Sequence, residues 1–171
     1  MSDDEKVILE SKVKNMIVQY LTGIMKNDIS DAEHFIKDQP KEYALNIIND
    51  MITNNCRKMY DELNVSNIRI SNGIHSNNEV IYQVSATIKY LDYMMDLSSG
   101  ESYGSTNKRC EREINLKVVK KNNTTQDSVM RCPGCGHSID VYYSGKCENC
   151  GSIFNLEDYD YQILEISKNL M

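Results

Sequence analysis

Four cysteines in the last third of the chain form its most specific chemical pattern. They occur as two Cys-x-x-Cys pairs, Cys132 with Cys135 and Cys147 with Cys150, separated by residues 136–146. Thiolates are the ligands that zinc prefers in structural sites, and two such pairs joined by a hairpin supply a complete tetrahedron. The spacing therefore predicts one structural Zn²⁺ bound by Cys132, Cys135, Cys147 and Cys150, in a small zinc ribbon.

A glycine follows the second cysteine of each pair. Gly136 and Gly151 can adopt backbone conformations that cost other residues free energy, and a tight turn around a metal ion requires such conformations. A turn of this kind points backbone N–H groups at the thiolates. The two glycines thus favour metal-binding knuckles.

Other uses of the cysteines remain as alternatives. An iron site of the rubredoxin type has the same four ligands, and His137 is a further candidate ligand. A redox centre needs only one Cys-x-x-Cys pair, and disulfides need an oxidising compartment, for which the acidic residues 1–5 give no export signal. Cys56 and Cys110 are expected to be free thiols that pack as small apolar side chains.

The composition is typical of a chain that folds around an apolar core. The 171 residues are 40% hydrophobic and carry a formal net charge of −6, which fits one domain plus a small module. Nucleic acids and anionic membranes attract a surplus of lysine and arginine, so this charge disfavours both as general partners. No apolar run approaches the roughly 20 residues of a membrane-spanning helix, and a cytoplasmic location is expected.

The first third of the chain has helical periodicity. Ser2 and Glu5 have the form of a capping box, and the apolar residues that follow predict an amphipathic helix over 3–27. A second capping box predicts a short helix over 30–37. A third helix is predicted over 40–63, with its proline in the first turn.

Beyond residue 64 the apolar period changes from 3.6 to 2. Alternation predicts strands over 64–70, 80–90 and 108–120, and a last strand-like run over 159–166. Clean alternation is typical of an antiparallel sheet that is covered on one face. The predicted fold class is therefore α+β, with N-terminal helices packed on a curved antiparallel sheet.

A polar segment, residues 120–127, separates the predicted sheet from the cysteines. The chain is accordingly divided into a helical and antiparallel-sheet domain over 1–127, a four-cysteine zinc ribbon over 128–156, and a C-terminal strand over 157–171. If that strand returns to the main sheet, the ribbon is an insertion in a hairpin.

The order helix, short helix, long helix and strands resembles the nuclear transport factor 2-like cone. Together with Asp92-Tyr93-Met94-Met95-Asp96, the Ser-Gly turn after it, the four cysteines and Asp158-Tyr159-Asp160-Tyr161, it resembles bacterial zinc-ribbon proteins. Those proteins carry a domain like the membrane-associated one of mitochondrial import translocase subunit 44. The resemblance implies a non-enzymatic domain that docks on a membrane or a protein partner through a groove lined by the sheet.

The favoured function is a zinc-binding interaction or scaffold module. It would dock a protein, peptide or lipid partner through the cone groove or the ribbon surface. An alternative is a small-molecule-binding or acid–base enzyme of the cone fold, with Asp92 and Asp96 beside Tyr90 and Tyr93. Carboxylates at strand ends more often lie in water.

A second alternative is a nucleic-acid-binding ribbon. The charged side chains between the first and last cysteine are Asp140, Lys146 and Glu148, and their negative sum is the wrong sign for phosphates. The basic stretch over 108–121 is expected to be a solvated face whose charges are balanced by acidic helices. Nucleic acid is therefore not the expected partner.

Overall fold

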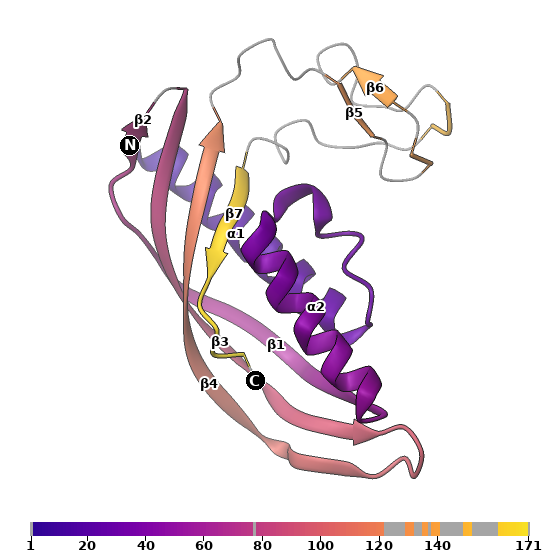
Figure 1. Ribbon diagram of the computed structural model, residues 1–171. Helices are drawn as coiled ribbons and strands as arrows, with labels where there is room; N and C mark the ends of the chain where they lie inside the picture. The colour runs from indigo at the N-terminus through magenta and orange to yellow at the C-terminus, as the bar shows by residue number, and fades with distance from the viewer. Residues whose placement is uncertain are drawn as a thin grey trace.

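The computed structural model describes residues 2–76, 78–121, 129–131, 135–136, 138–140, 149–151 and 161–170. These residues form two α-helices packed on a curved antiparallel sheet, together with a separate two-stranded sheet (Figure 1). The predicted α+β class is confirmed at this level.

Helix α1 (Asp3–Met25) begins where the capping box predicted. Ser2 N donates to Glu5 Oε2 over 3.1 Å, and Glu5 N donates to Ser2 Oγ over 3.2 Å, so two of the helix's free N–H groups are satisfied. After the helix, Asn27 has a φ of 58°, a left-handed conformation that stops helical hydrogen bonding. One stripe of the helix is buried: Leu9, Val13, Met16, Ile17, Tyr20, Leu21 and Ile24.

The second predicted helix is smaller than expected. It is a single 3-10 turn, η1 (Glu33–Phe35), and its N-cap residue makes no side-chain cap. The expected second capping box is absent here, because Ser30 N donates to Asp28 Oδ1 over 3.0 Å in a local turn that competes with helix formation.

Helix α2 (Asp38–Thr53) has its proline in the first turn, as predicted, but ends ten residues earlier than predicted. The prediction of helix as far as residue 63 was wrong, because Asn55 has a φ of 49° and the chain turns there into strand β1 (Cys56–Ile70). Within the helix, the face that carries Ala44, Ile47 and Met51 is buried.

The main sheet has the strand order β1-β3-β4-β7, with β2 also paired to β3, and all pairs are antiparallel. Several strands are longer than the alternation alone indicated. Their bounds are β2 (Ile74–Ser76), β3 (Glu79–Asp96), β4 (Ser102–Lys121) and β7 (Tyr161–Ile166). The separate sheet pairs β5 (Val129–Arg131) with β6 (Ser138–Asp140).

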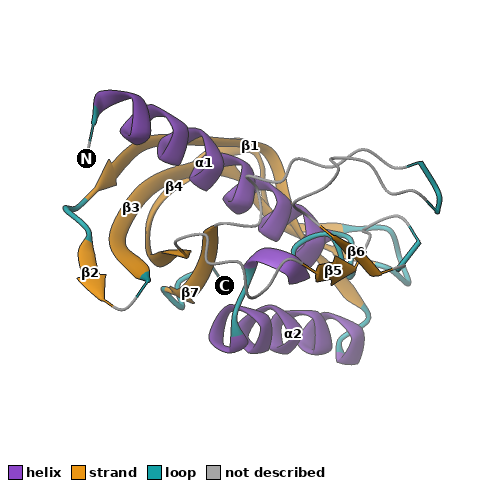
Figure 2. Ribbon diagram, turned by 90° about the horizontal axis from the view of Figure 1, so that it is seen from above, coloured by secondary structure: helices purple, strands orange, loops and turns teal. Residues whose placement is uncertain are grey.

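Irregularities in pairing accompany the curvature of the sheet. The β1–β3 register shifts between Asp61 and Asn64 and again between Ser66 and Arg69, and a residue within each shift has a positive φ, 54° at Glu62 and 50° at Asn67. Bulges of this kind bend a strand and increase its twist. Figure 1 shows the strands as an arc with both helices on its concave side, and Figure 2 shows the same arc from above.

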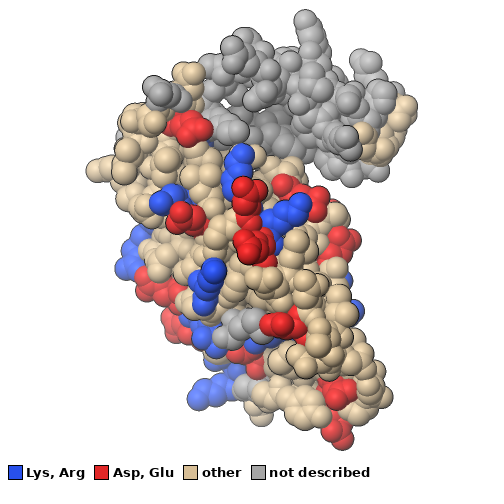
Figure 3. Space-filling model, viewed as in Figure 1, with Lys and Arg blue, Asp and Glu red and all other residues tan. Residues whose placement is uncertain are grey.

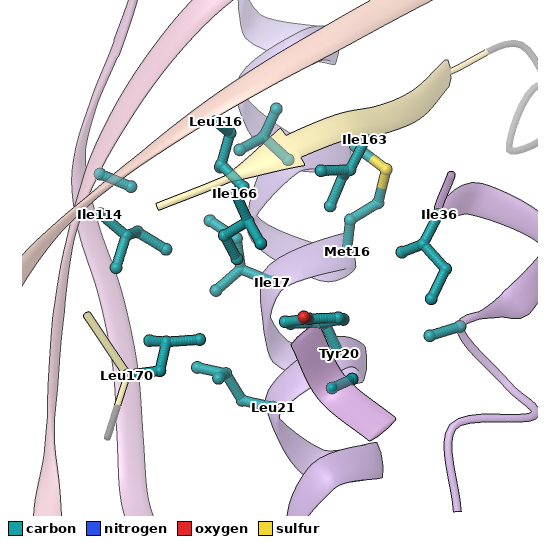
Figure 4. Packing of buried hydrophobic residues seen from close by; sticks show 14 of the residues in the cluster. Met16, Ile17, Tyr20, Leu21, Ile36, Ile114, Leu116, Ile163, Ile166 and Leu170 are labelled. Carbon is teal, nitrogen blue, oxygen red and sulfur yellow. The ribbon is translucent and has the colours of Figure 1, made fainter. Parts of the chain in front are cut away.

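The core lies between the helices and the concave face of the sheet (Figure 4). Helix α1 packs on β1, and α2 packs on β7 and β1. Tyr20 is fully buried, and its hydroxyl donates to the Pro40 carbonyl over 2.7 Å, which ties α1 to α2 without an unsatisfied polar atom. Ile163 and Ile166 of β7 are buried in the same core, so the strand that follows the cysteines completes it.

Candidate metal centre

The cysteines lie in a segment that leaves the main sheet and returns to it. Strand β4 ends at Lys121 and β7 begins at Tyr161, and the two strands are neighbours, with Lys120 opposite Tyr161 and Leu116 opposite Ile166. Residues 122–160 are therefore inserted between two paired strands. The exact domain boundaries given above stay a prediction.

The first Cys-x-x-Cys pair lies in a hairpin connection. Strands β5 and β6 pair with Arg131 opposite Ser138, so residues 132–137 form the connection between them. Cys135 is exposed, and Gly136 after it has a φ of 77°. That left-handed conformation is the one for which a glycine was expected here.

The glycine after the second pair has the same backbone conformation. Cys150 is exposed, and Gly151 after it also has a φ of 77°. The two Cys-x-x-Cys-Gly segments therefore have the same backbone conformation at their glycine, which is the residue that a metal-binding knuckle requires to turn. Agreement between them is what a duplicated metal-binding turn requires.

A hydrogen bond joins the two pairs. Asn149 Nδ2, beside the last cysteine, donates to Cys135 Sγ over 3.4 Å. An N–H donor to sulfur can orient a metal-binding side chain. Sequence reasoning missed Asn149, because only the approach of the two knuckles gives its amide a role.

The chemistry of these donors fits a zinc ion. Cys135 and Cys150 are in the described residues, whereas Cys132, Cys147 and His137 lie outside them. Among the described residues, which hold two of the four expected ligands, no group of three or more His, Cys, Asp or Glu is placed to hold a metal. Iron of the rubredoxin type would use the same thiolates.

A second polar cluster lies on the inner face of the main sheet, around Asp92. Lys58 Nζ donates to Asp92 Oδ1, and Arg112 Nη2 lies 3.3 Å from Asp92 Oδ2. The Lys58 side chain is 7% exposed and that of Asp92 is 21% exposed. The expectation that Asp92 lies in water was wrong, because two cations on neighbouring strands compensate its burial.

Two tyrosines complete this cluster. Arg112 Nε donates to the Tyr90 hydroxyl over 2.9 Å, and the Tyr60 and Tyr90 rings meet edge to face at 5.0 Å. Burial raises the pKa of Tyr90, and the Cys110 thiol opposite it raises that pKa further. Burial also raises the pKa of Tyr60. The hydroxyls therefore stay protonated well into the alkaline range.

The other members of the predicted acid–base set lie apart from this cluster. Asp96 Oδ1 accepts from the N–H groups of Ser98 and Ser99 over 2.8 and 3.1 Å, so it closes the turn after β3. The Tyr93 hydroxyl donates to Asp61. The structure thus brings Tyr90 and Asp92 together and leaves Tyr93 and Asp96 in separate contacts.

Most of the basic residues of β4 contact acidic or aromatic partners. Arg109 Nε lies 3.2 Å from Glu62 Oε2, and Lys117 Nζ lies 3.7 Å from Glu165 Oε2. Lys120 Nζ lies 5.7 Å from the centre of the Tyr161 ring. Figure 3 shows acidic and basic side chains interspersed over the face in view. The face is charge-balanced, as expected, but these acidic partners lie on strands β1 and β7 and not on the helices that were expected to supply them.

No protein-family model matches the chain, and no curated protein matches it. None of the helices in the described ranges is long and apolar enough to cross a membrane.

Proposed function

We propose that this chain is a non-enzymatic, zinc-binding interaction module. In this proposal a helix-and-sheet body of the cone type carries a zinc ribbon between β4 and β7 and docks a protein or peptide partner. The observation that carries the proposal is the matched pair of knuckles: Gly136 and Gly151 have the same φ of 77°, and Asn149 bonds across to Cys135.

A structural role for the metal follows from its ligands. Four thiolates fill a zinc tetrahedron and leave no open position for water or substrate. The zinc would therefore hold the shape of the ribbon rather than perform chemistry. Because the described cysteines Cys135 and Cys150 are exposed, the ribbon would present its metal-supported surface outward, where a partner can reach it.

The contacts of the body also favour binding over catalysis. Asp92, the best-placed carboxylate for acid–base work, accepts from Lys58 through Oδ1 and from Arg112 through Oδ2, so both of its oxygens already have partners. A lipid surface is a less suitable partner than a protein, because the charges of β4 are matched by acidic neighbours and the net charge is −6.

Metal analysis of protein prepared without a polyhistidine tag tests the zinc site. The intact chain should carry one equivalent of zinc by elemental analysis. A variant with both Cys135→Ser and Cys150→Ser should carry almost none. The matched control is Cys56→Ser with Cys110→Ser, which removes two half-buried thiols outside the ribbon and should retain the zinc.

Iron in place of zinc, or no metal in the intact chain, would overturn the zinc assignment. The interaction role is tested with the same variants by affinity capture and mass spectrometry. Partners that bind the ribbon should be recovered with the intact chain and the control variant, and lost with the Cys135→Ser, Cys150→Ser variant. Identical recovery with all three proteins would count against a role for the ribbon.

A further inference from the structure

The residues that follow β7 are bound by the body through main-chain and side-chain hydrogen bonds. We infer that the surface beneath Ile166–Leu170 is a binding site for a short peptide with apolar residues at its first and fifth positions. This chain's own segment is the resident ligand. The inference rests on the proposed interaction function and names the class of partner that the body would accept.

Strand β4 contacts one side of the segment. Ser167 N donates to the Asn115 carbonyl over 2.9 Å, and Asn115 N donates to Ser167 Oγ over 3.0 Å. Asn169 Nδ2 donates to the Glu113 carbonyl over 2.7 Å. The segment thus continues along β4 beyond the end of β7, in the manner of a peptide added to a sheet edge.

Helix α2 contacts the other side. The Gln39 side-chain amide donates to the Ile166 carbonyl over 3.1 Å and accepts from Ile166 N over 2.8 Å. One turn further along the helix, the Tyr43 hydroxyl accepts from Leu170 N over 2.9 Å. An amide that pairs with both main-chain groups of one residue recognises backbone, whatever side chain that residue carries.

The carbonyl of Leu170 is bound as well, because the Tyr60 hydroxyl on β1 donates to it over 3.1 Å. Both main-chain groups of Leu170 therefore have tyrosine hydroxyls as partners. Tyr60 is 2% exposed, so these contacts lie in the interior, where an unsatisfied polar group is costly.

Two positions of the segment are held by buried apolar side chains. Ile166 is 4% exposed and Leu170 is fully buried, whereas Lys168 and Asn169 between them are exposed. Figure 4 shows Leu170 next to Leu21 of α1 and Ile114 of β4. Main-chain contacts with two apolar anchors define a ligand class: a short peptide with Ile or a similar residue, three intervening residues and Leu. Of the intervening residues, Ser167 and Asn169 add polar side-chain contacts to β4.

The resident segment is suited to exchange with a peptide in trans. Its buried side chains are Ile166 and Leu170, and its release breaks the pair between Ile166 and Leu116 at the end of β7 but leaves the pairs from Lys117–Glu165 to Lys120–Tyr161 in place. A tethered segment has an effective concentration near the millimolar range, and it therefore competes strongly with any free peptide. The intact chain is expected to bind such a peptide weakly until the segment is removed or its anchor is weakened.

The test uses a chain that ends at Glu165 and a fluorescent, amidated peptide with the sequence of residues 166–171. Fluorescence anisotropy should show saturable binding to the shortened chain, at least roughly 100-fold tighter than to the intact chain. The control is the same peptide with Leu170→Asp, which should bind at least about tenfold more weakly because it buries a charge. A shortened chain that is folded by circular dichroism and binds both peptides equally, or neither, would overturn the inference.

A second variant covers the case in which the shortened chain does not fold. Leu170→Ala in the full chain keeps every main-chain contact but removes the anchor. It should bind the probe more tightly than the intact chain does, and adding Tyr60→Phe should weaken that binding. Equal probe binding by the folded Leu170→Ala variant and the intact chain would contradict the inference. All these residues lie outside 122–160, so loss of the zinc assignment would leave this measurement unaffected, and its failure would leave the metal analysis unaffected.

Discussion

The helix-and-sheet body and the cysteine-bearing insertion are expected to depend on different sources of stability. The body buries a continuous apolar core drawn from α1, α2 and the main sheet. The insertion comprises residues 122–160. A fold of fewer than roughly 40 residues usually needs a metal or a disulfide to be stable. The two regions meet at β7, which follows the insertion yet contributes Ile163 to the core. A perturbation of one region should therefore spare the other, except at β7.

Removal of the proposed zinc should give the largest effect, and outside the insertion this effect should reach β7 alone. Structural zinc contributes roughly 10 kcal/mol or more to the folding of small zinc domains, so chelation is expected to abolish amide protection in β5 and β6. Without an ordered ribbon, the β4–β7 pair must close a longer free loop, at about 0.6 kcal/mol for each doubling. Strand β7 is therefore expected to lose about 1 kcal/mol of local stability.

Hydrogen exchange followed by mass spectrometry checks this prediction. Amides of β7 should exchange roughly fivefold faster after chelation, which corresponds to about 1 kcal/mol. Amides in the centre of β3, such as that of Ile88, should keep their rates. Unchanged exchange in β7 would mean that the ribbon is an independent appendage, and faster exchange throughout β3 would mean that the body itself depends on the metal.

Alkaline pH should also destabilise the protein, but it should act on the body and not on the insertion. Burial raises the pKa of Tyr20, Tyr60 and Tyr90 above the ordinary value of 10.0. The stability that these protonated hydroxyls confer is fully present below pH 10, and it is lost as the pH rises above 10 because the unfolded chain ionises first. In that window the free energy of unfolding should fall by about 1.4 kcal/mol per pH unit for each tyrosine, and by about 4 kcal/mol per pH unit for the three together.

Thermal unfolding between pH 8 and pH 11, with tyrosinate absorbance as a second signal, measures this effect. Unfolding and tyrosine ionisation should coincide above pH 10. Ionisation of all tyrosines in the folded protein near pH 10 would show that these hydroxyls are not enclosed. The variant Tyr103→Phe is the matched control, because Tyr103 is 55% exposed and its removal should not change the pH dependence.

The interior ion cluster offers the next largest perturbation of the body. Asp92→Ala leaves Lys58 and Arg112 without their shared carboxylate, and Lys58 has almost no access to water. Removal of one partner from a buried ion pair typically costs about 3–5 kcal/mol. Urea denaturation should show a loss of that size, with the zinc content unchanged.

Asp96→Ala is the control for this prediction. It removes a carboxylate of the same strand that bonds only to the turn amides of Ser98 and Ser99, and it should cost about 1 kcal/mol. Equal losses for the two variants would show that Asp92 is not an enclosed ion partner. A double variant, Asp92→Ala with Lys58→Met, should recover part of the stability, because the buried charge is then removed as well.

The parts of the fold that were predicted correctly depend on patterns within one segment of the sequence. The parts that were predicted wrongly depend on contacts between residues far apart in the sequence. Helix α1 was predictable because its cap and its apolar stripe lie within one segment. The first part of strand β1, residues 56–63, was predicted as helix, because its inward positions include Lys58, which breaks the apolar alternation. Burial of Lys58 depends on Asp92, a residue 34 positions away. Met59 and Leu63 meanwhile continued the helical spacing of α2 by chance.

In the candidate sites, too, the features within one segment were predictable and the contacts between distant segments were not. The cysteine positions and the need for Gly136 were readable from spacing, because a knuckle is a local structure. The bond from Asn149 to Cys135 depends on how two knuckles meet. The recognition of Leu170 by Tyr43 and Tyr60 joins residues more than a hundred positions apart, and no local pattern contains it.

Two matched glycines, one in each region, test with the smallest expected effect whether the insertion and the body are stabilised independently. Gly136 in the insertion and Gly100 in the turn after β3 have φ values of 77° and 76°, and an added Cβ would meet nothing within 4 Å at either position. Alanine should therefore cost about 1 kcal/mol at both sites, through backbone conformation alone. What should differ is where that cost appears.

Gly100→Ala should lower the free energy of unfolding of the body and leave zinc affinity unchanged. Gly136→Ala should lower zinc affinity by roughly fivefold, equivalent to about 1 kcal/mol, and leave the urea midpoint of the body unchanged. Competition with a chromophoric chelator and urea denaturation measure the two quantities on the same preparations. Gly136→Asn should restore most of the affinity, since asparagine tolerates the left-handed conformation. If Gly136→Ala destabilises the body as much as Gly100→Ala does, the two regions fold as one cooperative unit and the distinction between them fails.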